Sequence, residues 1–283
     1  MSSSSDIDMS NICVVLGGLA RNCANNLRKN LSWMREAIKM FHPDSHFLFI
    51  TNDSADDTQR ILEEFTCDIS NTKLYVLDGL SSRFTSRTER LAFCRNLFMN
   101  HIHTQLPHHE YAILADLDDI LINFEASRLR TCFDPVLTPP RWDVLAAVSY
   151  PHYYDMWALR SSRIGLNHDC IDAANHEMML NSTPRLQAHA KHIHDIKPKF
   201  TPTDPPFEVE SAFCGLAIYR LSATKGCKYI GSSEACSLGY PPEIFQHFCL
   251  KEVCEHVTFH KQMRERNSAH IFIFPPLHFT MTS

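Results

Sequence analysis

The chain has 283 residues, 44% of them hydrophobic and 21% charged, a composition that supports one large core or two fused ones and excludes a disordered or fibrous protein. Its 27 Lys and Arg residues against 32 Asp and Glu residues give a net charge of −5, and no run of basic residues occurs. These charges argue against a nucleic-acid partner or a polybasic membrane patch, so we expect a small-molecule partner.

Residues 1–10 are serine-rich and acidic, and we expect them to form a disordered N-terminus. They lack the basic and apolar regions of a signal peptide, and no apolar stretch approaches the roughly 20 residues of a membrane span. The 11 cysteines are dispersed and mostly lie inside apolar runs, which is typical of free thiols in a reducing compartment. The sequence therefore predicts a cytoplasmic protein without a membrane span.

Apolar runs with the length of buried strands recur along the chain. They lie at 12–16, 47–50, 74–77, 111–115, 144–148, 212–219 and 271–274. Apolar residues between Leu27 and Phe41 recur at spacings of three and four, which predicts an amphipathic helix, and the stretch 86–106 continues this pattern. The alternation of strands and helices predicts an α/β fold with a mainly parallel, Rossmann-like sheet flanked by helices.

The alternation weakens beyond about residue 150, and the stretch 181–206 has so little pattern that we expect a mobile loop there. We therefore predict one domain with two halves. The first half, 11–120, would bind a nucleotide, and the looser second half, 121–283, would bind an acceptor and carry catalytic groups.

Three acidic residues follow the fourth apolar run directly. Because side chains alternate along a strand, Asp116 and Asp118 are expected on the same side of the backbone, with Asp119 beside them. Such a cluster repels itself unless a cation lies between the carboxylates, and oxygen ligands suit Mg²⁺ or Mn²⁺, which bridge phosphate oxygens. The alternative is that these acids are turn residues or helix caps after a strand.

One enzyme class that uses such a segment is the HAD-type phosphohydrolase, in which the first aspartate of a DxDG motif is the nucleophile. Asp116 would have that role here. The chain departs from the pattern, because Asp119 stands where the glycine is expected and the motif follows the fourth apolar run instead of the first. A HAD-like phosphohydrolase remains an alternative, as does a non-catalytic sugar-binding module.

The segments 11–22, 47–58 and 87–96, with the acids at 116–118, resemble the GT-A glycosyltransferases. In that family a nucleotide-binding half leads into a DxD motif that holds the metal and diphosphate of a sugar nucleotide. The resemblance implies contacts with the donor from Gly17, Gly18, Arg21, Asn52, Asp53, Arg87, Arg95 and Asp116. Taken singly, the glycines are equally consistent with a tight turn, Asn52 and Asp53 with a helix entry, and the arginines with a solvated helix face.

The resemblance also implies a bound Mn²⁺ or Mg²⁺, held by Asp116 and Asp118. A histidine would complete the metal shell, and His256 is the first candidate, with His260 and His278 as alternatives.

The segment 153–160 combines two aromatic residues with an acid and an arginine. Aromatic faces stack on sugar rings and acids bind hydroxyls, so Tyr154, Asp155 and Trp157 are candidate acceptor-binding residues. Gly215, in the similar segment 208–219, would allow close backbone approach. The alternative is an aromatic core with an ion pair at the surface.

An inverting transfer needs a carboxylate that takes the proton from the acceptor hydroxyl, whereas a retaining transfer does not. Glu255 is the first candidate for this base and Glu210 the second. The chain resembles the small cytosolic glycosyltransferases that large algal viruses encode, one group of which transfers xylose with inversion. This likeness implies UDP-xylose as donor, an oligosaccharide or glycoprotein as acceptor, and the host cytoplasm as location.

Overall fold

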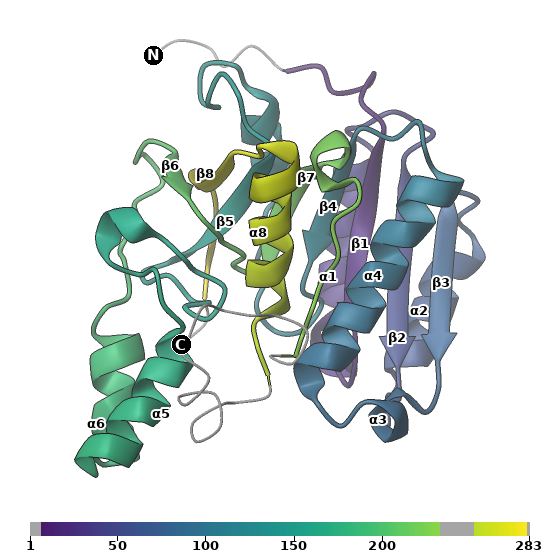
Figure 1. Cartoon of the computed structure of the whole chain (residues 1–283). Coiled ribbons are helices and arrows are strands. Elements are labelled where there is room, and N and C mark those ends of the chain that lie inside the picture. Colours follow the sequence, from purple (N-terminus) through teal and green to yellow (C-terminus); the bar gives the residue numbers. More distant parts are fainter. Residues whose placement is uncertain (1–6, 233–251, 282–283) are drawn as a thin grey trace.

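Eight strands form one sheet at the centre of the molecule, in the spatial order β3-β2-β1-β4-β7-β5-β8-β6 (Figure 1). The computed structural model describes residues 7–232 and 252–281. The strands are β1 (Val14–Ala20), β2 (His46–Asn52), β3 (Thr72–Leu77), β4 (Tyr111–Ala115), β5 (Val144–Tyr150), β6 (Phe207–Val209), β7 (Leu216–Arg220) and β8 (Ile271–Thr280). Both halves of the chain therefore build the same sheet.

The direction of the strands places several carboxyl ends at one edge. β1 pairs in parallel with β2 and β4, and β2 pairs in parallel with β3. β7 is antiparallel to both β4 and β5, whereas β8 is parallel to β5 and antiparallel to β6. Ligands of such sheets bind outside the carboxyl ends of the strands, so the loops after β1, β2 and β4 are where a site is expected.

Helices cover both faces of the sheet, with α4 and α8 side by side on one face and α1 and α2 packed together on the other (Figure 1). The α-helices are α1 (Ala24–Ile38), α2 (Thr58–Cys67), α3 (Leu80–Arg83), α4 (Arg87–Gln105), α5 (Cys170–Asn181), α6 (Arg185–His189) and α8 (Glu255–Asn267). Shorter helices are η1 (Ala126–Phe133), η2 (Ser162–Ile164), η3 (Ala190–His194) and η4 (Leu221–Thr224). In α1, the buried residues Leu27, Leu31 and Met34 form the predicted apolar stripe.

The structure confirms the predicted α/β fold class, and each of the predicted apolar runs overlaps a strand. The short strand β6 lies outside the predicted apolar runs. Two expectations were wrong. The stretch 181–206 contains α6 and η3 instead of forming a mobile loop. Residues 1–6 lie outside the described residues, but the end of the predicted disordered terminus is ordered, because Met9 is only 1% exposed.

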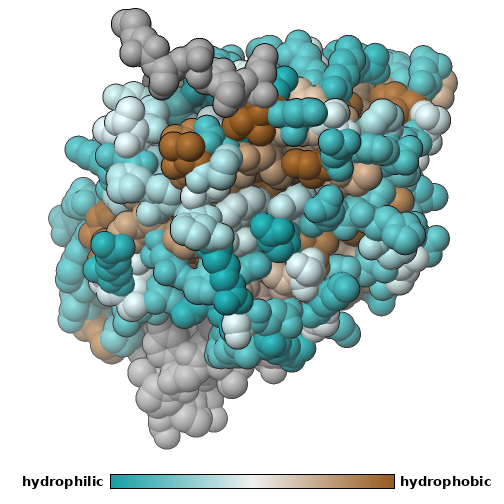
Figure 2. Space-filling view, turned by 90° about the horizontal axis from the view of Figure 1, so that it is seen from above, coloured by the Kyte–Doolittle hydropathy of each residue, from teal (hydrophilic) through white to brown (hydrophobic). Residues whose placement is uncertain are grey.

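The cysteines within the described parts of the chain are unpaired thiols, as predicted. In those same parts no helix is both long and apolar enough to pass through a lipid bilayer. The end of the molecule where β2 and β3 begin is mostly hydrophilic, with scattered hydrophobic residues (Figure 2).

Gly17 and Gly18 lie inside β1 and not in the turn where they were expected to contact a nucleotide. A Cβ atom on Gly17 would collide with the carbonyl oxygen of Leu48 in β2, and one on Gly18 would collide with that of Ala115 in β4. Their role in this structure is to let three strands approach closely.

We expect Gly18→Ala to lower the free energy of unfolding by about 1–3 kcal/mol, because the added methyl group overpacks a buried strand whose neighbour is rigid backbone. Urea denaturation followed by circular dichroism measures this change. An unaltered unfolding midpoint would contradict the close-packing role.

Candidate active site

A cavity of about 360 Å³ opens at the carboxyl ends of β1, β2 and β4, which is within the range of small-molecule sites. Its polar lining comes from the ends of these strands and the loops after them, from the segment after β5, from α4 and from the start of α8. These residues are Arg21, Asn22, Asn52, Arg87, Arg90, Arg95, Asp116, Asp118, Asp155, Trp157, Glu255 and His256. The site thus joins residues from both halves of the chain.

The backbone of the acidic loop after β4 is fixed from two sides. The Asp116 amide donates a 2.7 Å hydrogen bond to the carbonyl oxygen of Gly215, which has a φ of 71°. The side-chain amide of the buried Asn30, in α1, donates a 2.7 Å hydrogen bond to the carbonyl oxygen of Asp118. Both carboxylates line the cavity, as their alternation along the chain predicted.

The acids of this cavity repel one another. Burial raises the pKa of Asp116 to about 7, and the carboxylates of Asp118, Asp155 and Glu255 add to this rise while Arg95 opposes it. Burial also raises the pKa of Asp118, which the charge of Arg87 partly offsets. A cation bound between Asp116 and Asp118 would relieve this repulsion, so the donor set fits a hard divalent ion.

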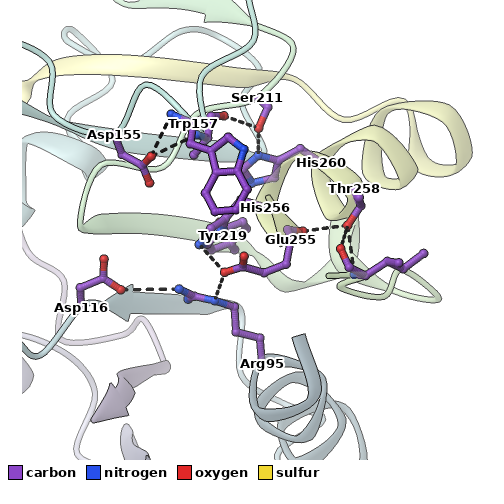
Figure 3. A network of polar contacts seen from close by, with 12 residues as sticks. Arg95, Asp116, Asp155, Trp157, Ser211, Tyr219, Glu255, His256, Thr258 and His260 are labelled. Atoms are coloured by element: carbon purple, nitrogen blue, oxygen red, sulfur yellow. Dashed lines mark hydrogen bonds and ion pairs between the residues drawn. The ribbon is translucent and has the colours of Figure 1, made fainter. Parts of the chain in front are cut away.

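Arg95 joins the acidic loop to the start of α8 (Figure 3). The side chain is buried in α4. Its Nε donates a 3.0 Å hydrogen bond to Glu255 Oε1, and its Nη2 lies 3.5 Å from Asp116 Oδ1. Its guanidinium carbon lies 5.1 Å from the centroid of the Phe213 ring. Burial alone would lower the pKa of Arg95, but the two carboxylates outweigh it and raise the pKa, so Arg95 stays charged.

Asp155 is oriented by its own turn. Its Oδ1 accepts hydrogen bonds of 3.1 Å from the backbone amides of Trp157 and Ala158. Burial raises the pKa of Asp155 to about 6 despite these bonds. The Trp157 ring is held by a 2.8 Å hydrogen bond from its Nε1 to Asp169 Oδ2. A carboxyl group with this pKa can exchange protons near neutral pH.

His256 is 2% exposed, lines the cavity and stacks on Phe213 with 3.8 Å between ring centroids. Within the described parts of the chain, neither of its ring nitrogens has a hydrogen-bond partner, and its Nε2 lies 3.8 Å from Glu255 Oε1. Burial lowers the pKa of His256 well below its usual value, so the ring is neutral. His260, one turn later, is different, because Ser211 and Tyr219 satisfy its two nitrogens at 2.9 and 3.1 Å. Buried nitrogens without hydrogen bonds are unfavourable, and a polar group bound in the cavity would satisfy them.

Several of the predicted site residues lie together. The structure brings the predicted donor residues Arg21, Asn52, Arg87, Arg95 and Asp116 into the cavity, with Asp155, Trp157, Asp118, Glu255 and His256. Other residues of the lining, such as Phe213, Asn22 and Leu91, were not predicted. The only signal for these three residues was their place in the segments 208–219, 11–22 and 87–96.

Other predicted site residues lie outside the cavity lining. Asp53 accepts hydrogen bonds from the amides of Gly79 and Ser81 at 2.6 and 2.7 Å, and the hydrogen bonds to Ser81 are the main reason that its pKa falls to about 2. Glu210 accepts a 3.0 Å hydrogen bond from the amide of Ser162. Tyr154 is 41% exposed at the surface. Asp53, Glu210, Tyr154, Gly17, Gly18 and Gly215 are not among the described residues that line the cavity.

The predicted trio of metal ligands is not assembled. Among residues 7–232 and 252–281, no three His, Cys, Asp or Glu side chains are grouped closely enough to hold an ion. His256 stacks on Phe213, and the alternative His278 has its Nδ1 3.2 Å from Arg128 Nη1. The two aspartates therefore remain as candidate ligands without a third side chain.

No family model and no curated protein matches the chain. It is similar to a solved structure of a mycobacterial protein, with 9% identity and a TM-score of 0.49 over 96% of this chain and 67% of that one. It is also similar to the mannosyltransferase PcManGT from Pyrobaculum calidifontis in complex with GDP-Man and Mn²⁺. The identity is 11% and the TM-score 0.43, over 98% of this chain and 59% of that one. It is similar as well to S. aureus TarS 1-349, with 13% identity and a TM-score of 0.44 over 93% of this chain and 58% of that one. The chain thus spans less than two thirds of the last two structures.

Proposed function

We propose that the chain is a metal-dependent glycosyltransferase that moves a sugar from a nucleotide-sugar donor to a glycan hydroxyl. The observation that carries this proposal is the cavity itself. It places the carboxylates of Asp116 and Asp118 and four arginines at the carboxyl edge of a parallel sheet, where nucleotides bind. Acids that hold a divalent ion and arginines that contact phosphate together suit a diphosphate.

In this proposal Asp116 and Asp118 hold Mn²⁺ or Mg²⁺, which offsets the charge of the diphosphate when bound. The exposed side chains of Arg21 and Arg87, on the rim of the cavity, contact the same phosphates. Arg95 lies deeper and keeps Asp116 in position through their 3.5 Å ion pair. Asn52, the last residue of β2, contacts the nucleoside.

Asp155 is our candidate for the base, in place of Glu255 and Glu210. Glu210 accepts a hydrogen bond from the Ser162 amide, and one carboxylate oxygen of Glu255 accepts a hydrogen bond from Arg95. Asp155 lines the cavity and is raised in pKa to about 6. Its carboxylate takes the proton of the acceptor hydroxyl while the acceptor oxygen bonds to the anomeric carbon and the bond from that carbon to the diphosphate breaks. This is an inverting displacement.

The donor we propose first is UDP-xylose, with an oligosaccharide or glycoprotein as acceptor. A thermal-shift screen of nucleotide sugars tests this, because a ligand that binds only the native state raises the melting temperature. We expect stabilisation by a UDP-sugar together with Mn²⁺ and not by either alone, followed by transfer to an acceptor. Trapping of beryllofluoride on Asp116 would favour a phosphohydrolase, and stabilisation by free glycans alone would favour a sugar-binding module.

We expect Asp155→Asn to lower kcat by about 10²–10⁴-fold, because the amide cannot accept the proton. The Kd of the metal–nucleotide complex is expected to stay within about twofold, since Asp155 is not a proposed ligand of either group. Glu210→Gln is the matched control and should transfer sugar normally. Full activity of the Asp155→Asn enzyme would exclude the residue as base.

We expect the affinity for Mn²⁺ and nucleotide to fall as the pH decreases through about 7. The pKa of Asp116 is raised to about 7, so at lower pH the carboxyl group must release a proton before it can bind a cation. Calorimetry in two buffers with different ionisation enthalpies measures that proton release. Binding without proton release near pH 7 would contradict this prediction.

A further inference from the structure

Three polar atoms meet at the end of the sheet opposite the cavity. His46 Nδ1 lies 2.7 Å from the carbonyl oxygen of Asp44 and 3.1 Å from His109 Nε2. His109 Nε2 also lies 3.1 Å from the Asp44 oxygen. The two rings meet edge to face, with 4.9 Å between their centroids. His46 begins β2 and His109 lies two residues before β4, so the cluster joins the strands on either side of β1.

Hydrogen bonds cannot satisfy all three of these contacts at once. The carbonyl oxygen only accepts, so each imidazole nitrogen must carry a proton to bond with it. If both nitrogens carry a proton, the 3.1 Å contact between them joins two donors. If one lacks a proton, its lone pair faces the carbonyl oxygen. A bound cation removes this conflict, because all three atoms then present lone pairs to it.

We propose that His46, His109 and the carbonyl oxygen of Asp44 bind a divalent transition-metal ion of the zinc type. Imidazole nitrogens suit Zn²⁺, Cu²⁺ and Ni²⁺, whereas the oxygen-only acids of the cavity suit Mg²⁺ and Mn²⁺. Ligands of a tetrahedral zinc ion at about 2.0–2.1 Å lie roughly 3.3 Å apart, so separations of 2.7 and 3.1 Å need only small shifts. Both histidines are half-buried, which leaves water access to the fourth position.

The neighbouring contacts indicate what the ion does. Ser45 Oγ accepts a 3.1 Å hydrogen bond from the Val14 amide, and the Glu110 amide donates a 3.0 Å bond to the carbonyl oxygen of Cys13. The segments that carry His46 and His109 are therefore already hydrogen-bonded to the chain at the start of β1. An ion between the two histidines fastens the loops to each other across β1 and stabilises the native state.

Calorimetry with Zn²⁺ in excess Mg²⁺, and the visible spectrum of bound Co²⁺, test the site without any assay of activity. We expect one ion to bind the wild-type chain and raise its melting temperature. His46→Gln and His109→Gln should each weaken Zn²⁺ binding at least about tenfold and abolish the stabilisation. His270→Gln and Asp118→Asn are controls that should keep it, because His270 pairs with Glu208 elsewhere and Asp118 lies in the cavity.

These measurements test the proposed zinc site and do not depend on the proposed transferase activity. Absence of stoichiometric Zn²⁺ binding, or binding that survives both histidine substitutions, would overturn it. Loss of binding in His270→Gln would show adventitious capture by surface histidines and would overturn it as well. If the two histidine variants still fold by circular dichroism without Zn²⁺, their loss of binding reports ligand removal and not unfolding.

Discussion

Asp118→Asn is expected to lower sugar transfer at least about 10³-fold and to remove the dependence of nucleotide binding on Mn²⁺. The amide keeps the size of the side chain but lacks the charge that binds the cation and, through it, the diphosphate. The fold should be unaffected or slightly stabilised, because burial and the Asp119 carboxylate raise the pKa of Asp118 and make its charge unfavourable there. Initial rates and isothermal titration with UDP, with and without Mn²⁺, measure these effects.

Asp119→Asn is the matched control for this experiment. Asp119 is the next residue in the chain and carries the same charge, but it is not part of the described cavity lining. We expect it to keep wild-type transfer. Equal losses in Asp118→Asn and Asp119→Asn would mean that general negative charge matters and not a ligand position. Unchanged transfer by Asp118→Asn would exclude the proposed metal role.

The strands and the acidic edge could be predicted from the sequence because local patterns determine them. Apolar runs identify strands such as β1 and β4 wherever both faces of a sheet are covered, and the period of two places Asp116 and Asp118 on one side. The approach of Arg95 to Asp116 could also be predicted. The helix α4 precedes the parallel strand β4, so the first half of α4 lies near the carboxyl end of β4.

The rest of the site depends on contacts between distant segments, which periodicity does not encode. Glu255 and Glu210 are both acids near apolar residues, but only the fold shows that the first is paired with a buried arginine and the second with a surface serine. The role of the glycines in β1 could not be predicted for the same reason. A glycine pattern fits a turn as well as a crowded strand, and the collision with the Leu48 carbonyl oxygen appears only when the neighbouring strand is present.

Arg95→Met is expected to reduce the free energy of unfolding by about 3–5 kcal/mol. Arg95 and Glu255 are 5% and 4% exposed, so removal of the guanidinium leaves a buried carboxylate without its partner. Urea denaturation measures the change. Arg90→Met is the matched control in the same helix, because the Arg90 side chain donates to the carbonyl oxygens of Phe84 and Thr85 and its loss should reduce stability by only about 1 kcal/mol.

The double variant Arg95→Met/Glu255→Leu separates the structural role of the pair from its chemical role. Replacement of both members of a buried ion pair by apolar residues removes the unpaired charge, so we expect it to recover most of the lost stability. Transfer should stay low all the same, because Asp116 has then lost the cation 3.5 Å from its carboxylate that holds it in position. If the double variant regains both stability and transfer, Arg95 serves only to neutralise Glu255. If it remains as unstable as Arg95→Met, the arginine stabilises the protein through its contacts with Asp116 and the Phe213 ring.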